Sequence, residues 1–454
     1  MPIERSERVE RVERITARDA EAAQRRAAGW LRARGLASGD RVAIIAQSSR
    51  AYLAAALGAL RTGVVPVLLN PALVPLEQQA LLEDAQPALV LRDADLPALL
   101  DGSPVDIADV PLARPMLYTS GTTGKPKGVW SGVLAEEDAR ALVAEERELW
   151  GFARDDVHLV VSPLHHSAPL RFATGSLLAG ADVVLLGGFD VARLVRAIAE
   201  HRPTSAFVVP AHLQRLFAAD REAATDLSSF RVLAHAGAPC PEALKREALR
   251  RFPAGSVWEF YGSTEGQFTA CSPDEWLARP GTVGRARSGR RIDVDPDGTI
   301  WCTVPRHARF TYWRDPDKTA RAWRGDAFSV FDLGRLDPDG FLFLDGRRDD
   351  LIISGGVNVY PLEVERALLA HPRVREAAVF PLADERWGQM VCAAVVGDAE
   401  AAELEPWLAE RLAPYKRPKR IVRVDEIPHS PTGKVRRARL ALDLGLDRGP
   451  STRA

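Results

Sequence analysis

The sequence has little cysteine and no long apolar run. The four cysteines lie far apart among the 454 residues, with no CxxC pair and no nearby histidine partner; they are Cys240, Cys271, Cys302 and Cys392. This spacing argues against a cysteine-based zinc site and against disulfides, and it is typical of thiols in a reducing cytoplasm. No stretch reaches the roughly 18 uninterrupted apolar residues of a membrane span, because Arg61 and Asp182 interrupt the most apolar segments.

The chain also has almost no net charge. Sixty Lys and Arg residues stand against 61 Asp and Glu residues, so we expect neither nucleic acid nor an anionic membrane as the main partner. Residues 1–19 alternate acids and bases and have no apolar core of the kind that a secretory signal needs. We therefore expect residues 1–19 to form a solvated helix or a frayed tail, and we expect the protein to be cytoplasmic.

The chain is long enough for two to four domains, and its pattern changes along its length. From about residue 41 to 262, short apolar runs alternate with segments of helical period, which predicts parallel sheets covered on both faces. Between about 281 and 345, two Asp-Pro-Asp-Gly turns separate short strands, which predicts a small antiparallel unit. The remaining residues alternate strands and helices, as expected of a second, smaller α+β domain.

The segment MLYTSGTTGKPKGVW, residues 116–130, has the composition of a phosphate-binding loop. It offers free backbone N–H groups, short hydroxyl donors and lysines, which are the groups that an oligophosphate needs. It is not a Walker A loop, because Pro126-Lys127 follows Gly121 where that motif needs Gly-Lys, and the dinucleotide motif GxGxxG is absent.

This loop resembles the signature loop of the acyl-adenylate-forming superfamily, which includes acyl-CoA synthetases. Further segments match the superfamily's motifs in the same order: PLHHSAPLRF, HAGAPCP, FYGSTEG, YWRDPDKTA, FDLGRLDPDGFLFLDGRRDDLIISGGVNVYPLEVE and PHSPTGKVRR. The resemblance implies an α/β fold: a large N-terminal domain of doubly wound sheets plus a small β-barrel, residues 1–347, then a smaller mobile α+β domain, residues 348–454. It also implies an AMP-forming ligase that uses ATP, Mg²⁺ and coenzyme A, and dimers occur among such proteins.

The resemblance implies roles for residues that would bind the nucleotide. The phosphate loop contributes Thr119, Ser120, Gly121, Thr122, Thr123 and Lys127. Adenine and ribose would contact Gly237, Ala238, Pro239, Tyr261, Gly262, Asp332 and Arg347. Thr264 would bond the α-phosphate, and Glu265 would hold Mg²⁺, a hard cation that prefers oxygen ligands. One departure from the usual pattern is Val330-Phe331 before Asp332, where small residues are usual.

The second domain would bring further groups to the site. Lys434 resembles the lysine that bridges carboxylate and α-phosphate oxygens during adenylation. Asp349 resembles the hinge about which the domain turns, and Ser354-Gly355-Gly356 would leave room for the pantetheine arm of coenzyme A. His166 falls where the superfamily places a gate beside the acyl site, although a histidine there is also compatible with a role in the core.

The acid is left open by the sequence, and so is the acceptor. His166-Ser167-Ala168 lacks the Asp that amino-acid-activating relatives carry, and the flanking segments are most similar to synthetases for fatty, bile or aromatic acids. The acceptor could instead be the thiol of a carrier protein or an amine. In a small subgroup of the superfamily, the enzyme activates nitrite rather than a carboxylic acid and diazotises an aromatic amine. A nucleotide-binding scaffold is a non-enzymatic alternative, yet Lys434 and Glu265 are both present. A luciferase would need a luciferin pocket for which the sequence shows no specific pattern.

Overall fold

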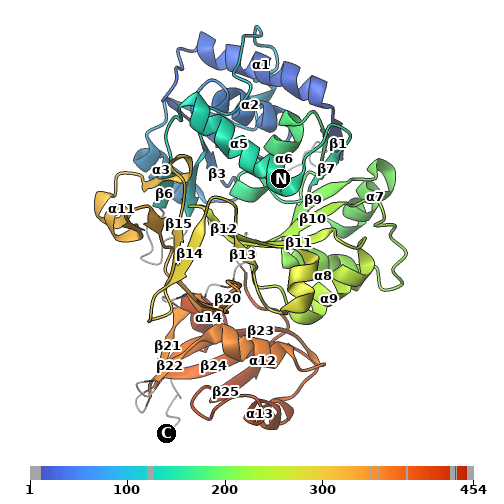
Figure 1. Ribbon diagram of the computed structural model, residues 1–454, viewed down its shortest axis with the longest axis vertical. Coiled ribbons are helices and arrows are strands. Elements are labelled where there is room, and N and C mark those ends of the chain that lie inside the picture. Colours follow the sequence, from blue (N-terminus) through green and yellow to red (C-terminus); the bar gives the residue numbers. More distant parts are fainter. Residues whose placement is uncertain are drawn as a thin grey trace, which may run out of the picture.

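The computed structural model describes residues 12–119, 127–347, 350–354, 357–384, 387–429, 435 and 437–446. Two large mixed sheets form its upper part in Figure 1, and a smaller sheet with its helices lies below them. This arrangement confirms the predicted α/β fold with a C-terminal α+β part. No helix in the described ranges has the length and apolar character needed to cross a bilayer.

The first large sheet has six strands. Their order is β16 (Thr311–Tyr312), β6 (Lys127–Trp130), β5 (Met116–Thr119), β3 (Val65–Leu69), β2 (Arg41–Ile45) and β4 (Leu89–Arg92). The last four are parallel, as the apolar runs predict, while β6 and β16 are antiparallel additions at one edge. The accompanying helices are α1 (Ala17–Ala33), α2 (Arg50–Leu60), α3 (Pro75–Ala85) and α4 (Leu96–Leu99).

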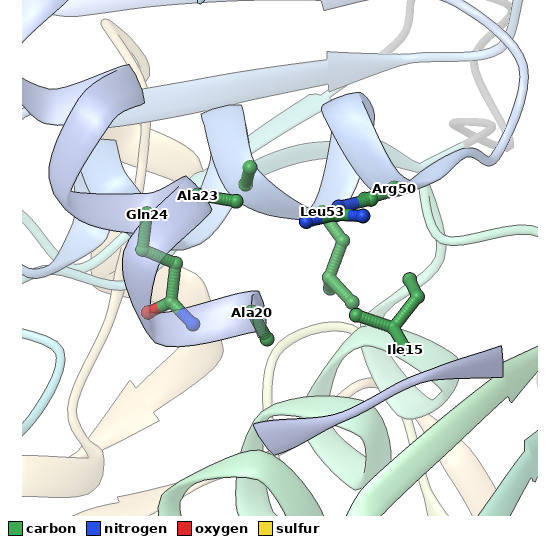
Figure 2. Close-up of a pocket in the computed structure, with 7 residues that line it drawn as sticks. Ile15, Ala20, Ala23, Gln24, Arg50 and Leu53 are labelled. Carbon is green, nitrogen blue, oxygen red and sulfur yellow. The ribbon is translucent and has the colours of Figure 1, made fainter. Parts of the chain in front are cut away.

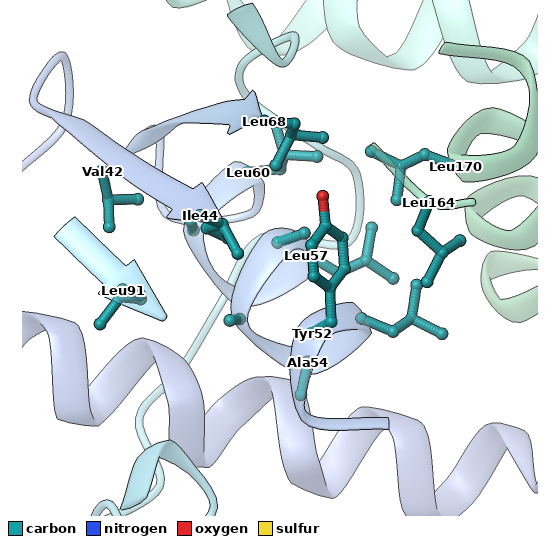
Figure 3. Packing of buried hydrophobic residues seen from close by; sticks show 14 of the residues in the cluster. Val42, Ile44, Tyr52, Ala54, Leu57, Leu60, Leu68, Leu91, Leu164 and Leu170 are labelled. Carbon is teal, nitrogen blue, oxygen red and sulfur yellow. The ribbon is translucent and has the colours of Figure 1, made fainter. Parts of the chain in front are cut away.

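Close packing of α1 on α2 anchors this sheet. Thr16 caps α1 by accepting a hydrogen bond from the Asp19 amide at 3.1 Å. A Cβ on Gly58 of α2 would lie 2.7 Å from the Gln24 carbonyl, so only glycine permits this approach. Tyr52 lies fully buried among leucines of this core (Figure 3), and burial raises the pKa of its hydroxyl far above the ordinary value. The crevice between α1, α2 and β1 has no room for a water molecule (Figure 2), so we assign it to packing.

The second large sheet has eight strands. Their order is β1 (Glu13–Ile15), β8 (Asp182–Leu185), β7 (Val157–Val160), β9 (Ser205–Val208), β10 (Val232–His235), β11 (Val257–Gly262), β12 (Gln267–Cys271) and β13 (Arg285–Ala286). The five strands from β8 to β11 are parallel. Its helices are α5 (Glu136–Trp150), α6 (Ser167–Leu178), α7 (Val191–His201), α8 (Pro210–Ala219), α9 (Glu242–Arg251) and α10 (Pro273–Ala278).

The N-terminal prediction is wrong for residues 13–15. They form the edge strand β1, antiparallel to β8, rather than a helix or a tail. Ile15 is buried in the core, while Arg14 points outward and pairs with Asp182 at 2.8 Å. The alternating acidic and basic residues of this segment therefore include a short strand, in which Ile15 is the buried side chain. Residues 1–11 lie outside the described ranges.

Apart from β16, the strands within residues 291–347 form two small antiparallel sheets with a common core, as the Asp-Pro-Asp-Gly turns predict. One has the order β14 (Arg291–Val294), β15 (Ile300–Thr303), β18 (Ala327–Phe328) and β17 (Trp323–Arg324); the other pairs β19 (Asp332–Leu336) with β20 (Leu342–Arg347). The short helices here are η2 (Arg306–Ala308) and α11 (Pro316–Ala322). This unit lies between the two large sheets and the C-terminal part (Figure 1).

The last sheet draws all of its strands from residues 352–423. It contains β22 (Val357–Val359), β21 (Ile352–Ser354), β24 (Gly388–Gly397), β23 (Val374–Asp384) and β25 (Arg420–Arg423). Its helices are α12 (Pro361–Leu369), α13 (Ala401–Ala409) and α14 (Arg437–Asp443). The described contacts with the rest of the chain include the hydrogen bond from the Gln214 side chain to the Arg375 carbonyl at 3.5 Å.

Candidate active site

Thr264 and Glu265 lie in the tight turn between β11 and β12. The Ser263 amide donates to the Gly266 carbonyl at 2.8 Å and closes this turn. The strand register shifts at Tyr261/Gly262, and a Cβ on Gly262 would lie 2.9 Å from the Gly266 carbonyl oxygen. The Thr-Glu pair is therefore in a hairpin turn rather than at a helix start, and glycine at 262 allows the close return of the chain.

Tyr261 connects this hairpin to β19. Its hydroxyl donates a hydrogen bond of 2.6 Å to Asp332 Oδ2, and both residues are buried. The register of β19 and β20 places Asp332 opposite Arg347, whose backbone alone is described. The sequence predicted that Tyr261, Asp332 and Arg347 share one part of the site, and the structure brings all three together.

Phe331 precedes Asp332 with a backbone conformation that is unusual for an aromatic residue. Its φ is +63°, in the left-handed region that favours glycine. The Phe331 amide donates to Ser329 Oγ at 2.9 Å, and the residue is 37% exposed. The bulky residue predicted near the ribose therefore stands at the surface, while the carboxylate after it is buried.

Glu265 is held by a tyrosine to which the sequence assigned no role. The Tyr312 hydroxyl donates to Glu265 Oε1 at 2.9 Å, and both residues are buried. Burial and the negative charge of Glu265 raise the pKa of Tyr312, which keeps it protonated as a donor. The pairing of Tyr312 with Val129 brings β6 close, and Lys127 Nζ lies 5.8 Å from the Tyr312 ring centroid.

The loop after β10 presents Gly237, Ala238 and Pro239, with Gly237 at φ +90°. His235, at the end of β10 just before this loop, belongs to a cluster of three buried polar side chains. Lys245 Nζ is 2.5 Å from His235 Nε2 and 3.5 Å from Glu259 Oε2. Burial, and then the charge of Lys245, lower the pKa of His235 well below its ordinary value, so the imidazole is neutral and accepts from the ammonium. Burial raises the pKa of Glu259, against the attraction of Lys245.

His166 is the residue that precedes helix α6, and its ring lies 4.3 Å from that of His165, centroid to centroid. Burial, followed by the neighbouring His166, lowers the pKa of His165 to about 3, so His165 is neutral near pH 7. The structure therefore places the predicted gate at a helix start with a second, neutral histidine against it.

Helix α6 also carries Arg171, part of a buried charge network for which the sequence shows no motif. Glu146 Oε1 accepts from Arg287 at 2.8 Å and from Gln267 at 3.0 Å, while Arg171 Nε lies 3.0 Å from Glu146 Oε2. Burial alone would raise the pKa of Glu146, but Arg171 and Arg287 outweigh it and hold the value at about 2. Because Gln267 opens β12, this network supports the hairpin that carries Thr264 and Glu265. Arg287 also lines a cavity of about 520 Å³ beside β13 and β14.

Several predicted site residues lie outside the described ranges. They are Ser120, Gly121, Thr122, Thr123, Asp349, Gly355, Gly356 and Lys434. For Thr119 the backbone alone is described, at the end of β5. Among the described predicted residues, contacts join the β11–β12 turn to β19 through Tyr261 and to β6 through Tyr312. Gly237, Ala238 and Pro239 follow β10, and His166 precedes α6.

Comparisons with known proteins identify the family. Residues 3–113 and 115–302 match the family model of the AMP-binding enzyme, and residues 363–434 match that of the AMP-binding enzyme C-terminal domain. The chain is 32% identical to the indoleacetate–CoA ligase of Aromatoleum aromaticum, over 91% of this chain and 90% of the relative.

Solved structures are similar over nearly the whole chain. The o-succinylbenzoate CoA synthetase of Bacillus subtilis, in complex with its acyl-adenylate intermediate, has a TM-score of 0.81 and 30% identity, covering 93% of this chain and 92% of the synthetase. The same synthetase is known in complex with ATP and a magnesium ion. The amide bond synthetase McbA of Marinactinospora thermotolerans has a TM-score of 0.82 and 27% identity, covering 94% of each chain.

Proposed function

The chain belongs to the AMP-binding enzyme family, and from this premise we propose that it is an AMP-forming acid–CoA ligase acting on a fatty or aromatic acid. The first half-reaction joins the acid to AMP and releases pyrophosphate; the second transfers the acyl group to the thiol of coenzyme A. The observation that carries the proposal is the convergence of Tyr261–Asp332 and Tyr312–Glu265 on one hairpin, with Lys127 beside them.

The roles of the residues follow from this geometry and from the family resemblance. Asp332 would accept hydrogen bonds from the ribose hydroxyls while Tyr261 holds its other oxygen. The loop 237–239 would lie against adenine, with Tyr261 and Gly262 forming the adjacent wall. Thr264 would donate to the α-phosphate, and Lys127 with the rest of its loop would hold the β- and γ-phosphates.

The chemistry of Glu265 fits a magnesium ion. Mg²⁺ is bound through one or two carboxylates together with substrate phosphates rather than by a cage of protein ligands. The described ranges contain no cluster of three or more metal-ligating side chains, which such a site does not need. A bound Mg²⁺ would neutralise charge on the phosphate oxygens, while Tyr312 fixes the orientation of the Glu265 carboxylate.

We also propose that residues 348–454 form a separate domain that turns about Asp349, bringing first Lys434 and then the Gly355-Gly356 segment to the site. The separate C-terminal sheet supports this division, because it takes no strand from earlier residues. Limited proteolysis with and without ATP and acid tests it. A cytoplasmic location fits the supply of ATP and coenzyme A. Dimers occur in the superfamily that the sequence resembles, so a homodimer is included in the proposal, and sedimentation velocity tests it.

The test of the function is pyrophosphate release with ATP and Mg²⁺ across fatty, aryl and cinnamyl acids and nitrite, in parallel reactions with coenzyme A, with an aromatic amine or with neither, and with products identified by mass. A thioester from one acid would support the ligase. The likeness to an amide bond synthetase favours an amine as the second candidate acceptor. Pyrophosphate release with an amide or a diazo product, and without a thioester, would select an amine. ATP binding without pyrophosphate release from any of the acids or nitrite would favour a nucleotide-binding scaffold.

A further inference from the structure

Lys318 lies beside the lysine that ends the phosphate loop. Lys318 belongs to α11, which follows β16, and β16 pairs with β6, the strand that begins at Lys127. Both ammonium groups approach one aromatic ring: Lys318 Nζ lies 5.5 Å and Lys127 Nζ 5.8 Å from the Tyr312 ring centroid. The hydroxyl of that tyrosine holds Glu265 at 2.9 Å. Two lysines and the proposed magnesium ligand therefore share one small region.

The carboxylate that pairs with Lys318 is distant and partly exposed. Asp315 Oδ2 lies 4.0 Å from Lys318 Nζ, at the edge of an ion pair, and the Asp315 side chain is 45% exposed. The Lys318 side chain is only 17% exposed, unlike a solvated surface lysine. Burial, and then the adjacent Lys127, lower the pKa of Lys318 to about 8. A multiply charged anion between the two ammonium groups would relieve their repulsion.

We propose that Lys318 is a second lysine for the β- and γ-phosphates of ATP and for the departing pyrophosphate. This inference rests on the proposed function. In the first half-reaction, a carboxylate oxygen forms a bond to the α-phosphorus, and the bond from that phosphorus to the bridging oxygen breaks. The electron pair of the broken bond stays on pyrophosphate. Lys318 and Lys127 would stabilise that growing charge from two directions, which accelerates the step.

The experiment measures the binding of ATP, pyrophosphate and AMP by titration calorimetry, each with Mg²⁺. Lys318→Ala is compared with the parent, with Lys318→Arg and with Arg321→Ala, which removes the same charge from an exposed position on the same helix. Because a hydrogen bond to a charged group is lost, we expect Lys318→Ala to weaken pyrophosphate and ATP about 10- to 100-fold. AMP lacks the outer phosphates, so its affinity should stay within about twofold, and Lys318→Arg should restore most of the loss.

The possible outcomes distinguish a failure of the proposed role of Lys318 from a failure of the proposed ligase function. Equal weakening of AMP and pyrophosphate by Lys318→Ala would show a structural role and overturn the inference. Unchanged pyrophosphate binding, or an equal loss in Arg321→Ala, would also overturn it. In either case, ATP binding by the parent would leave the proposed function standing. A parent that binds neither ATP nor pyrophosphate would overturn both, and a parent that binds pyrophosphate alone, through Lys318, would overturn only the function.

Discussion

Replacing Glu146 by Gln removes a buried carboxylate on α5 that is contacted from α6 and from β12. Arg287, Gln267 and Trp150 all donate to it within 3.1 Å, and Arg171 pairs with it at 3.0 Å. The fold lowers its pKa from the ordinary 4.5 to about 2, which corresponds to about 3 kcal/mol of stabilisation at neutral pH. Breaking one side of a buried ion pair costs a similar amount, about 3–5 kcal/mol.

The assay is urea unfolding followed by circular dichroism, with Glu148→Gln as the matched control. Glu148 lies on the same helix but is exposed, so its loss should change the unfolding free energy by less than about 0.5 kcal/mol. The folded-state pKa lies below the ordinary value. The carboxylate therefore stabilises the fold fully above pH 4.5 and loses this effect as the pH falls towards 2. The gap between parent and Glu146→Gln should be widest near pH 7 and narrow below pH 4.5. Equal effects of the two substitutions would refute the reasoning.

Three further predictions concern the active site. Lys434→Ala should slow pyrophosphate release about 10²- to 10³-fold, as the loss of one transition-state donor does; equal release by mutant and parent would refute its role. Tyr312→Phe removes the donor that holds Glu265, so the Mg²⁺ concentration for half-maximal pyrophosphate release should rise about tenfold, and an unchanged requirement would count against the magnesium site. Gly262→Ala places a Cβ 2.9 Å from the Gly266 carbonyl, so misplacing Thr264 should slow adenylation by at least about tenfold, whereas a normal rate would show that the turn adapts.

Much of the fold could be predicted because its strands are short, continuous apolar runs. The segment RVAII is β2, for example, and SAFV is β9. The short strand β1 could not be predicted in this way, since one buried isoleucine among charged residues gives no periodic signal. The family and the enzyme class follow from seven ordered motifs, and the family-model matches confirm them.

Less of the candidate site could be predicted from the sequence, because its residues are brought together by the pairing of strands that lie far apart in the chain. The motif YWRDPDKTA contains Tyr312 and Lys318, yet only the pairing of β16 with β6 shows that both lie beside Lys127. Glu146 and Arg287 likewise read as ordinary charges on a helix and in a loop until the fold buries them together. A periodic pattern reports local structure, whereas these contacts join segments far apart in the chain.

The left-handed backbone at Phe331 offers a route to engineering. Two hydrogen bonds hold this conformation. The Phe331 amide donates to the Ser329 hydroxyl, and the next residue, Asp332, accepts from the Tyr261 hydroxyl. Side chains substituted at 331 should therefore leave the backbone in the same direction and differ in bulk at an exposed position next to Asp332. A library randomised at this single position would vary the bulk beside the proposed ribose-binding carboxylate, while the hydrogen bond from Tyr261 keeps that carboxylate in place. Glycine would be its most stable member, since it adopts this φ without strain.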